Sequence, residues 1–163
     1  TRGSRRPLGS RRRGALRSDA DARAGREEDH VDQLSTEDRL QIADIVASYC
    51  YAIDQRRWDA FYDLFTADCR LDFGNVMGVF EGQEGLRRFT ATMSGLDLFM
   101  RHYTTNLVVR GDAARARADS YVLAITGSGA AQHQATGRYE DELVKIDGRW
   151  RIRERRAIIE VPA

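Results

Sequence analysis

The chain has 163 residues, a formal net charge of +1 and 42% hydrophobic residues. These values suit one domain with its own core, and no stretch approaches the roughly 18 apolar residues that a membrane span needs. The charge is uneven, because residues 1–33 hold nine arginines and six acids whereas residues 34–163 hold 17 basic and 19 acidic residues. We therefore expect no nucleic-acid footprint on the folded part and no membrane contact. We also expect a cytoplasmic protein in which Cys50 and Cys69 stay reduced.

Residues 1–33 contain almost no large apolar side chains. Such a segment buries too little surface to offset the entropy lost on ordering. We therefore expect a disordered, Arg-rich N-terminal extension, followed by a single domain over residues 34–163. A leader, an extension read from upstream sequence, an expression remnant and a nucleic-acid-binding arm would each fit this composition.

Helix signals open the ordered part. Ser35 to Asp38 form an S-x-x-D capping pattern, and apolar residues then recur at helical spacing as far as Ile53. A third helix is expected near residues 84–94. Between these two, a short second helix is expected to carry four aromatic residues, Trp58, Phe61, Tyr62 and Phe65.

Strand signals dominate the second half. Strands are expected over residues 69–73, 76–81, 99–110, 114–127, 132–146 and 149–161. Gly74-Asn75, Gly111-Asp112 and Asp147-Gly148 are the expected turns. Helices followed by a run of strands favour an α+β fold over a parallel sheet. A strongly curved sheet wrapped around helices forms a cone, and its open mouth suits a small molecule.

His102 is the first candidate for chemistry. The period-two alternation of a strand places His102, Thr104 and Asn106 on one face. A histidine and an asparagine on a shared face suggest the polar floor of a pocket, although an ordinary core or surface histidine gives the same pattern. No second histidine or cysteine stands at ligand spacing from His102, so we expect no metal site.

Asp54 closes the first predicted helix, where a carboxylate opposes the helix dipole at a cost of about 0.3–1 kcal/mol. Either it caps the next helix or it binds a pocket histidine, and the sequence favours neither. Tyr49 lies about 140° from Asp54 around a straight helix. It is therefore either a phenol that points into the cone or a core aromatic. Asp72 and Tyr139 lie on strands that could face the cavity, and Arg155 could turn inward after a bulge.

Four segments together resemble scytalone dehydratase, of the SnoaL-like branch of the NTF2-like superfamily. Residues 54–59 resemble its D-x-x-x-W-D segment, residues 70–73 its R-I-D-Y strand, residues 101–103 its Q-H-F strand, and residues 145–150 its K-I-D-G-x-W hairpin. Order and approximate spacing agree over about residues 36–157. The resemblance implies an NTF2-like (cystatin-like) cone, with N-terminal helices packed on a strongly curved mixed or antiparallel sheet.

The same resemblance implies a cofactor-independent lyase, isomerase or polyketide cyclase. Asp54 and His102 match the pair that acts as general base and acid during water elimination in the scytalone enzyme. Tyr49 resembles the tyrosine of bile acid dehydratases and would hold an enolate oxygen. The expected substrate is a polycyclic or polyketide-like small molecule, and the expected assembly is a homodimer through an exposed sheet face. Four further residues are expected to contact substrate: Asn106, Tyr139, Asp72 and Arg155.

The sequence departs from the scytalone dehydratase pattern at residues expected to surround Asp54 and His102. Ile53 stands where that enzyme has a tyrosine, Tyr139 stands where it has an asparagine, and no histidine stands near residues 125–127. Scytalone itself is therefore not the expected substrate. A non-catalytic ligand-binding protein or accessory subunit on the same fold is the alternative. A third possibility, an epoxide hydrolase-like Asp–Arg–Asp arrangement, would use Asp72, Arg155 and Asp141.

Overall fold

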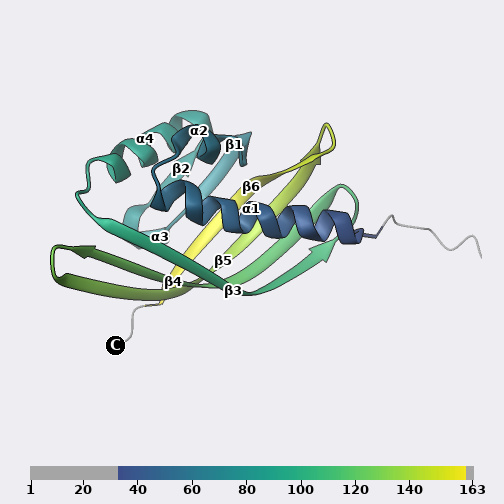
Figure 1. The fold of residues 1–163 in the computed structure, drawn as a ribbon. Helices are drawn as coiled ribbons and strands as arrows, with labels where there is room; N and C mark the ends of the chain where they lie inside the picture. The colour runs from purple at the N-terminus through teal and green to yellow at the C-terminus, as the bar shows by residue number, and fades with distance from the viewer. Residues whose placement is uncertain (1–32, 161–163) are drawn as a thin grey trace, which may run out of the picture. The chain divides into compact units, whose positions relative to one another are not determined.

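The computed structural model of the chain describes residues 33–160. The elements in these residues are α1 (Thr36–Asp54), α2 (Trp58–Tyr62), β1 (Phe65–Asp72), α3 (Gly74–Met77), β2 (Val79–Glu81), α4 (Gly82–Ser94), β3 (Phe99–Gly111), β4 (Arg115–Ser128), β5 (Ala131–Ile146) and β6 (Arg149–Glu160). Helix α1 runs across one face of a curved sheet (Figure 1). The expected α+β fold is confirmed. Apart from Gln33, the predicted N-terminal extension lies outside the described residues.

The six strands form one mixed sheet in the order β2-β1-β6-β5-β4-β3. Neighbouring strands are antiparallel except for β1 and β6, which run parallel. β1 begins at Phe65, a residue that the sequence had placed in the second helix, because Phe65 is buried and pairs with Ile152 of β6. The turn expected at Gly74-Asn75 is the short helix α3. The difference at Phe65 arises from pairing with a strand far away in the sequence, which overrides local propensity.

The start of α1 is fixed by the expected capping box. The Ser35 hydroxyl accepts the Asp38 N–H at 3.0 Å, and the Asp38 carboxylate accepts the Ser35 N–H at 3.3 Å. The other oxygen of Asp38 accepts hydrogen bonds from Lys145 Nζ at 2.7 Å and from Trp150 Nε1 at 2.8 Å. One buried carboxylate therefore joins the first turn of α1 to the β5–β6 hairpin.

These bonds make the fold sensitive to acid. Hydrogen bonds from Lys145, Ser35 and Trp150 hold the pKa of Asp38 well below its usual range. Because the pKa is lower in the folded chain than in the unfolded chain, the stabilisation is fully present above about pH 4 and is lost as the pH falls further. Asp38→Asn should therefore lower the free energy of unfolding by about 1–3 kcal/mol at pH 7 and flatten its dependence on pH below about 4.

Urea unfolding at pH 7, 5 and 3 would measure this effect. Asp44→Asn is the matched control, because Asp44 lies on the exposed side of the same helix. Equal stability losses in the two variants at pH 7 would contradict the assignment.

Local irregularities curve the sheet. The β3–β4 register shifts between Thr105 and Val108, and Asn106 there adopts a left-handed backbone with φ of 56°. On β5, a Cβ at position 137 would collide with the carbonyl oxygen of Ile158. Only glycine at this position therefore lets β6 pack so closely against β5. Such bulges and close approaches increase twist and redirect side chains. The orientations of Asn106 and Arg155 depend on these bulges.

Candidate active site

The end of α1 meets the edge strand β3 through Asp54. Its Oδ1 lies 2.6 Å from His102 Nδ1, and its Oδ2 accepts the His102 backbone N–H at 2.9 Å. Only 7% of the Asp54 side chain and 14% of the His102 side chain are exposed. The expected contact between the two residues is confirmed. Asp54 does not cap the next helix, because the N-cap of α2 is Arg57, which makes no side-chain capping bond.

This contact sets the tautomer of the neutral imidazole. An ionised carboxylate only accepts hydrogen bonds, so Nδ1 must carry the proton that it shares with Asp54. In the neutral ring, Nε2 is then the basic nitrogen. Nε2 makes no hydrogen bond with any of residues 33–160. The pair therefore presents one base to the space beside it, with a carboxylate behind that base.

Asp54 also has a structural function. The N–H of His102 points out of the open edge of the sheet, and Asp54 satisfies it. At the other end of α1, Arg39 Nη1 donates to the Val109 carbonyl of the same strand at 2.8 Å. Side chains at both ends of α1 thus cover polar backbone groups that an edge strand otherwise exposes. Experiments on Asp54 must separate this contribution from chemistry.

A pocket of about 460 Å³ lies between α1 and β3 and includes the pair. Tyr51 and Tyr103 line it and remain 64% and 53% exposed. Arg101 also lines it, and its guanidinium donates to the Met100 carbonyl oxygen at 2.8 Å and lies 4.6 Å from the centre of the Phe99 ring. The lining residues are Ala47, Cys50, Tyr51 and Asp54 from α1, and Arg101, His102, Tyr103, Thr104 and Thr105 from β3. The residues around the pocket therefore include one acid–base pair, two tyrosines and an arginine.

A second polar group is enclosed in the core. Arg155 and Asp141 are fully buried and form two parallel bonds, Nε to Oδ1 at 2.7 Å and Nη2 to Oδ2 at 2.5 Å. The guanidinium carbon lies 3.9 Å from the ring centre of Tyr49 and 4.4 Å from that of Tyr139. Burial alone would lower the pKa of Arg155, but Asp141 outweighs it and the net shift is upward. Arg155 thus remains a buried cation between two phenol rings.

A bulge brings Arg155 inward, as expected. Glu142 pairs with Glu154 and Leu143 with Ile152, so Arg153 has no partner in the β5–β6 ladder. The extra residue changes the phase of the strand. Ile152 and Arg155 consequently both face the core.

Tyr49 lies in this core and does not line the pocket of the pair. Burial raises the pKa of its phenol, which therefore stays protonated. Its hydroxyl has no hydrogen-bond partner among the described residues, and neither does Arg155 Nη1 or Ser120 Oγ. The geometry does not support the expected role of Tyr49 as an oxyanion donor beside His102. Tyr139, expected to contact substrate, is likewise a buried core residue.

Two further expected substrate contacts lie elsewhere. The bulge in β3 turns Asn106 to the exposed side, where it lines a different hollow with Tyr121. Asp72 forms an ion pair with Arg70 at 3.0 Å and accepts the Gly74 N–H at 2.7 Å. Neither residue lines the pocket of the pair. Because Asp72 is bound to Arg70, the structure also lacks the Asp–Arg–Asp arrangement of an epoxide hydrolase within residues 33–160.

The family model of the SnoaL-like domain matches residues 34–156. This stretch covers well over half of the chain and contains both members of the acid–base pair. The chain belongs to the SnoaL-like domain family. The resemblance inferred from the sequence motifs is thereby confirmed at the level of the family.

Relatives of this SnoaL-like protein differ in what their names imply. An uncharacterised protein of Mycobacterium tuberculosis is 29% identical over 118 residues, which cover 71% of this chain and 80% of that one. A β subunit of the terminal oxygenase component of Comamonas sp. terephthalate 1,2-dioxygenase is 28% identical over 136 residues, with coverages of 73% and 88%. A candidate scytalone dehydratase of Novosphingobium aromaticivorans superposes with a TM-score of 0.69 at 21% identity, covering 76% and 84%. At that identity the structural likeness shows the fold alone.

Sequence reasoning about this SnoaL-like domain missed Tyr51, which does not lie on the apolar stripe of α1. The missed signal is the spacing of Ala47, Tyr51 and Asp54, four and then three residues apart. Such residues are neighbours on one helix face. Cys50 and Asp141 could not be placed without the tertiary fold.

Within the part of the chain that the structure describes, no three histidine, cysteine or acidic side chains gather as a metal site would require. No helix among residues 33–160 is long and apolar enough to cross a membrane.

Proposed function

We propose that this SnoaL-like protein is a cofactor-independent lyase of the dehydratase type that acts on a polycyclic or polyketide-like small molecule. The observation that carries the proposal is the 2.6 Å contact between Asp54 and His102 in a pocket, where Nε2 binds none of the described residues. Isomerisation and cyclisation need the same proton transfers and belong to the same proposal.

In this mechanism His102 Nε2 removes a proton from the carbon beside a carbonyl, and the electron pair of that C–H bond forms an enolate. Asp54 stabilises the resulting imidazolium through Nδ1–H. The enolate then expels a β-hydroxyl group, which takes the proton back from Nε2 and leaves as water. A C=C bond has formed, and the neutral imidazole is restored. The step needs no oxidant and no group beyond the pair.

The pocket lining supports a flat, ring-containing substrate. Tyr51 and Tyr103 offer exposed aromatic rings on the two elements that bound the pocket, and ring systems pack well against such surfaces. Arg101, Thr104 and Thr105 of the lining also carry hydrogen-bond donors suited to a substrate carbonyl. A volume of about 460 Å³ lies in the range of small-molecule sites. Tyr49 has no role in this mechanism.

The first assay should test proton removal from the substrate, separately from loss of water. We expect the protein to catalyse exchange of the C2 protons of 1-tetralone for deuterium in heavy water. We also expect it to dehydrate 3-hydroxy-1-tetralone to the fluorescent 1-naphthol, because both reactions begin with proton removal beside a carbonyl. Mass spectrometry and fluorescence measure the two rates. Binding of these ketones with neither reaction would count against an enzyme and favour the alternative.

The alternative is an accessory subunit, and the relationship to a dioxygenase β subunit favours it. On either proposal, we expect a homodimer or larger homo-oligomer formed through the sheet face that carries the exposed side chains of Val108 and Tyr121. An accessory subunit would bind a partner protein and leave the ketones unchanged. The ketone assays separate the enzyme from the accessory subunit, and light scattering on the purified chain tests the expected homo-oligomer.

A further inference from the structure

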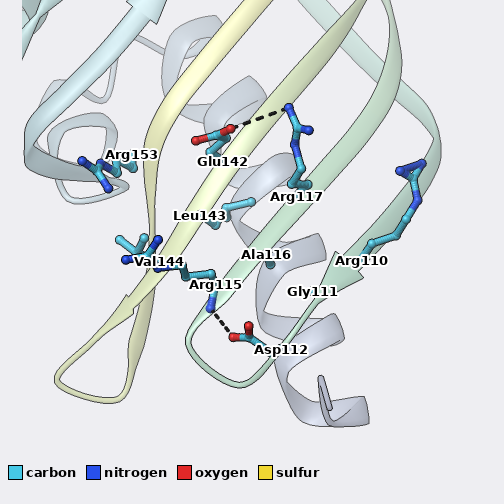
Figure 2. A pocket seen from close by; sticks show the side chains of 10 residues that line it. All are labelled: Arg110, Gly111, Asp112, Arg115, Ala116, Arg117, Glu142, Leu143, Val144 and Arg153. Atoms are coloured by element: carbon cyan, nitrogen blue, oxygen red, sulfur yellow. Dashed lines mark hydrogen bonds and ion pairs between the residues drawn. The ribbon is translucent and has the colours of Figure 1, made fainter. Parts of the chain in front are cut away.

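A second hollow, of about 350 Å³, lies on the sheet away from the acid–base pair. Figure 2 shows it across β3, β4, β5 and β6, with a helix behind the strands. Ala116 and Leu143 of its lining are buried residues of the core, whereas the charged side chains beside them in the strands are exposed. The hollow therefore opens on the outer face of the sheet. Four arginines line it: Arg110, Arg115, Arg117 and Arg153.

Negative charge in the lining does not balance these arginines. The acids in the lining are Glu142 and Asp112. Glu142 lies 3.6 Å from Arg117, which is a loose ion pair. The Asp112 carboxylate accepts the backbone N–H groups of Ala114 and Arg115, each at 2.8 Å. Two carboxylates thus face four guanidinium groups, and one of the two is already bound to backbone.

Partners outside the lining leave much of the positive charge free. Arg110 pairs with Asp119 at 2.9 Å, but Arg153 reaches Asp68 only at 3.9 Å, with both side chains more than half exposed. The Arg115 side chain forms no ion pair with any of residues 33–160. Exposed pairs of this kind contribute little stability. The guanidinium groups of Arg115 and Arg153 are therefore available to a ligand.

The register makes the arrangement unfavourable when the hollow is empty. Arg110 and Arg117 are direct partners in the β3–β4 ladder, and like charges opposite one another destabilise a sheet. Arg115 lies two residues before Arg117 on the same face. Arg153 is the extra residue of the β6 bulge. A bound anion would turn this repulsion into attraction.

We propose that this hollow binds a small anion that carries two or more phosphate groups. Guanidinium groups bind phosphate oxygens through paired, charge-assisted hydrogen bonds, and several arginines around one hollow suit a multiply charged ligand. No aromatic side chain belongs to its lining, so the stacking surface that single-stranded nucleic acids use is missing. The site does not depend on the proposed lyase function, because it shares no residue with the pocket of Asp54 and His102.

Calorimetric titration of the full chain with pyrophosphate at low ionic strength tests the proposal. Arg115→Gln and Arg117→Gln should each weaken binding by about 10-fold or more, because each removes a charge-assisted hydrogen bond. Glu142→Gln should strengthen binding, since it removes the carboxylate that competes for Arg117. Arg87→Gln is the control, because it removes the same charge from an exposed position on α4.

Several results would overturn the proposal. These are no heat of binding with the unaltered chain, an equal loss in Arg87→Gln, and equal affinity for orthophosphate or citrate. Tighter binding of a single-stranded oligonucleotide than of pyrophosphate would assign the surface to nucleic acid instead. Thermal melts of each variant establish that the fold is intact, and the gain expected for Glu142→Gln does not depend on any loss of stability.

Discussion

Replacement of His102 by glutamine is expected to lower turnover of a β-hydroxy ketone by on the order of 10²–10⁴-fold. Glutamine is similar in size to histidine, and its amide can still donate a hydrogen bond to Asp54. It has no nitrogen that can take a proton from carbon near neutral pH. The backbone bond from position 102 to Asp54 does not depend on the side chain. The loss should therefore appear in kcat, with KM and melting temperature nearly unchanged.

Asp54→Asn provides the second half of this test. The amide can still accept the backbone N–H of His102, but its NH₂ group would replace the oxygen that faces Nδ1 in one of its two orientations. That orientation favours the tautomer with the proton on Nε2, which cannot act as a base. Turnover should fall for this variant too. Because Asp54 also covers the edge of β3, its melting temperature must be measured alongside.

Deuterium exchange into 1-tetralone separates the possible outcomes. If His102→Gln abolishes both exchange and dehydration, then His102 is the base. If exchange and dehydration survive in this variant at the original rates, the acid–base role is wrong, and the contact with Asp54 serves only to fasten α1 to β3. Tyr51→Ala should raise KM and leave exchange in saturated protein unchanged, because Tyr51 only lines the pocket.

Features determined by local sequence could be predicted. The capping box at Ser35 and the β5–β6 turn at Asp147-Gly148 depend on a few neighbouring residues. The start of β1 and its parallel pairing with β6 depend on contacts between residues more than 80 positions apart. No local pattern reports such contacts. This is why Phe65 was wrongly assigned to a helix.

Some residues of the candidate site could likewise be located from local sequence patterns, and others could not. Asp54 could be found because a carboxylate at a helix end needs a partner. His102 could be found because side chains alternate between the two faces of a strand. Asn106 was placed wrongly because the bulge in β3 breaks that period. Tyr49 was wrongly expected beside His102. The resemblance supplied the position of a tyrosine in the sequence but not the direction in which its side chain points. In this chain that ring lies against Arg155 in the core.

The buried pair of Arg155 and Asp141 should give the largest loss of stability. Asp141→Ala leaves a guanidinium without its counterion in a fully buried position, and a change of this kind costs about 3–5 kcal/mol. Glu140→Ala is the matched control. Glu140 is the preceding residue on β5, but its side chain is partly exposed and pairs with Arg138 on the surface. Its loss should cost no more than about 1 kcal/mol.

A double replacement separates two contributions to the free energy of unfolding, neutralisation of the buried charge and packing of the guanidinium. Asp141→Leu combined with Arg155→Met removes both charges and fills the space with apolar side chains, so no buried ion is left unpaired. The double variant should be clearly more stable than Asp141→Ala in urea unfolding, even though it lacks two hydrogen bonds and the contacts of the guanidinium with Tyr49 and Tyr139. If it is as unstable as Asp141→Ala, packing of the guanidinium between the two rings stabilises the core more than neutralisation of its charge does. If Asp141→Ala itself loses less than about 1 kcal/mol, Arg155 has another acceptor in the folded protein. That acceptor would bind Nη1, which has no partner among residues 33–160.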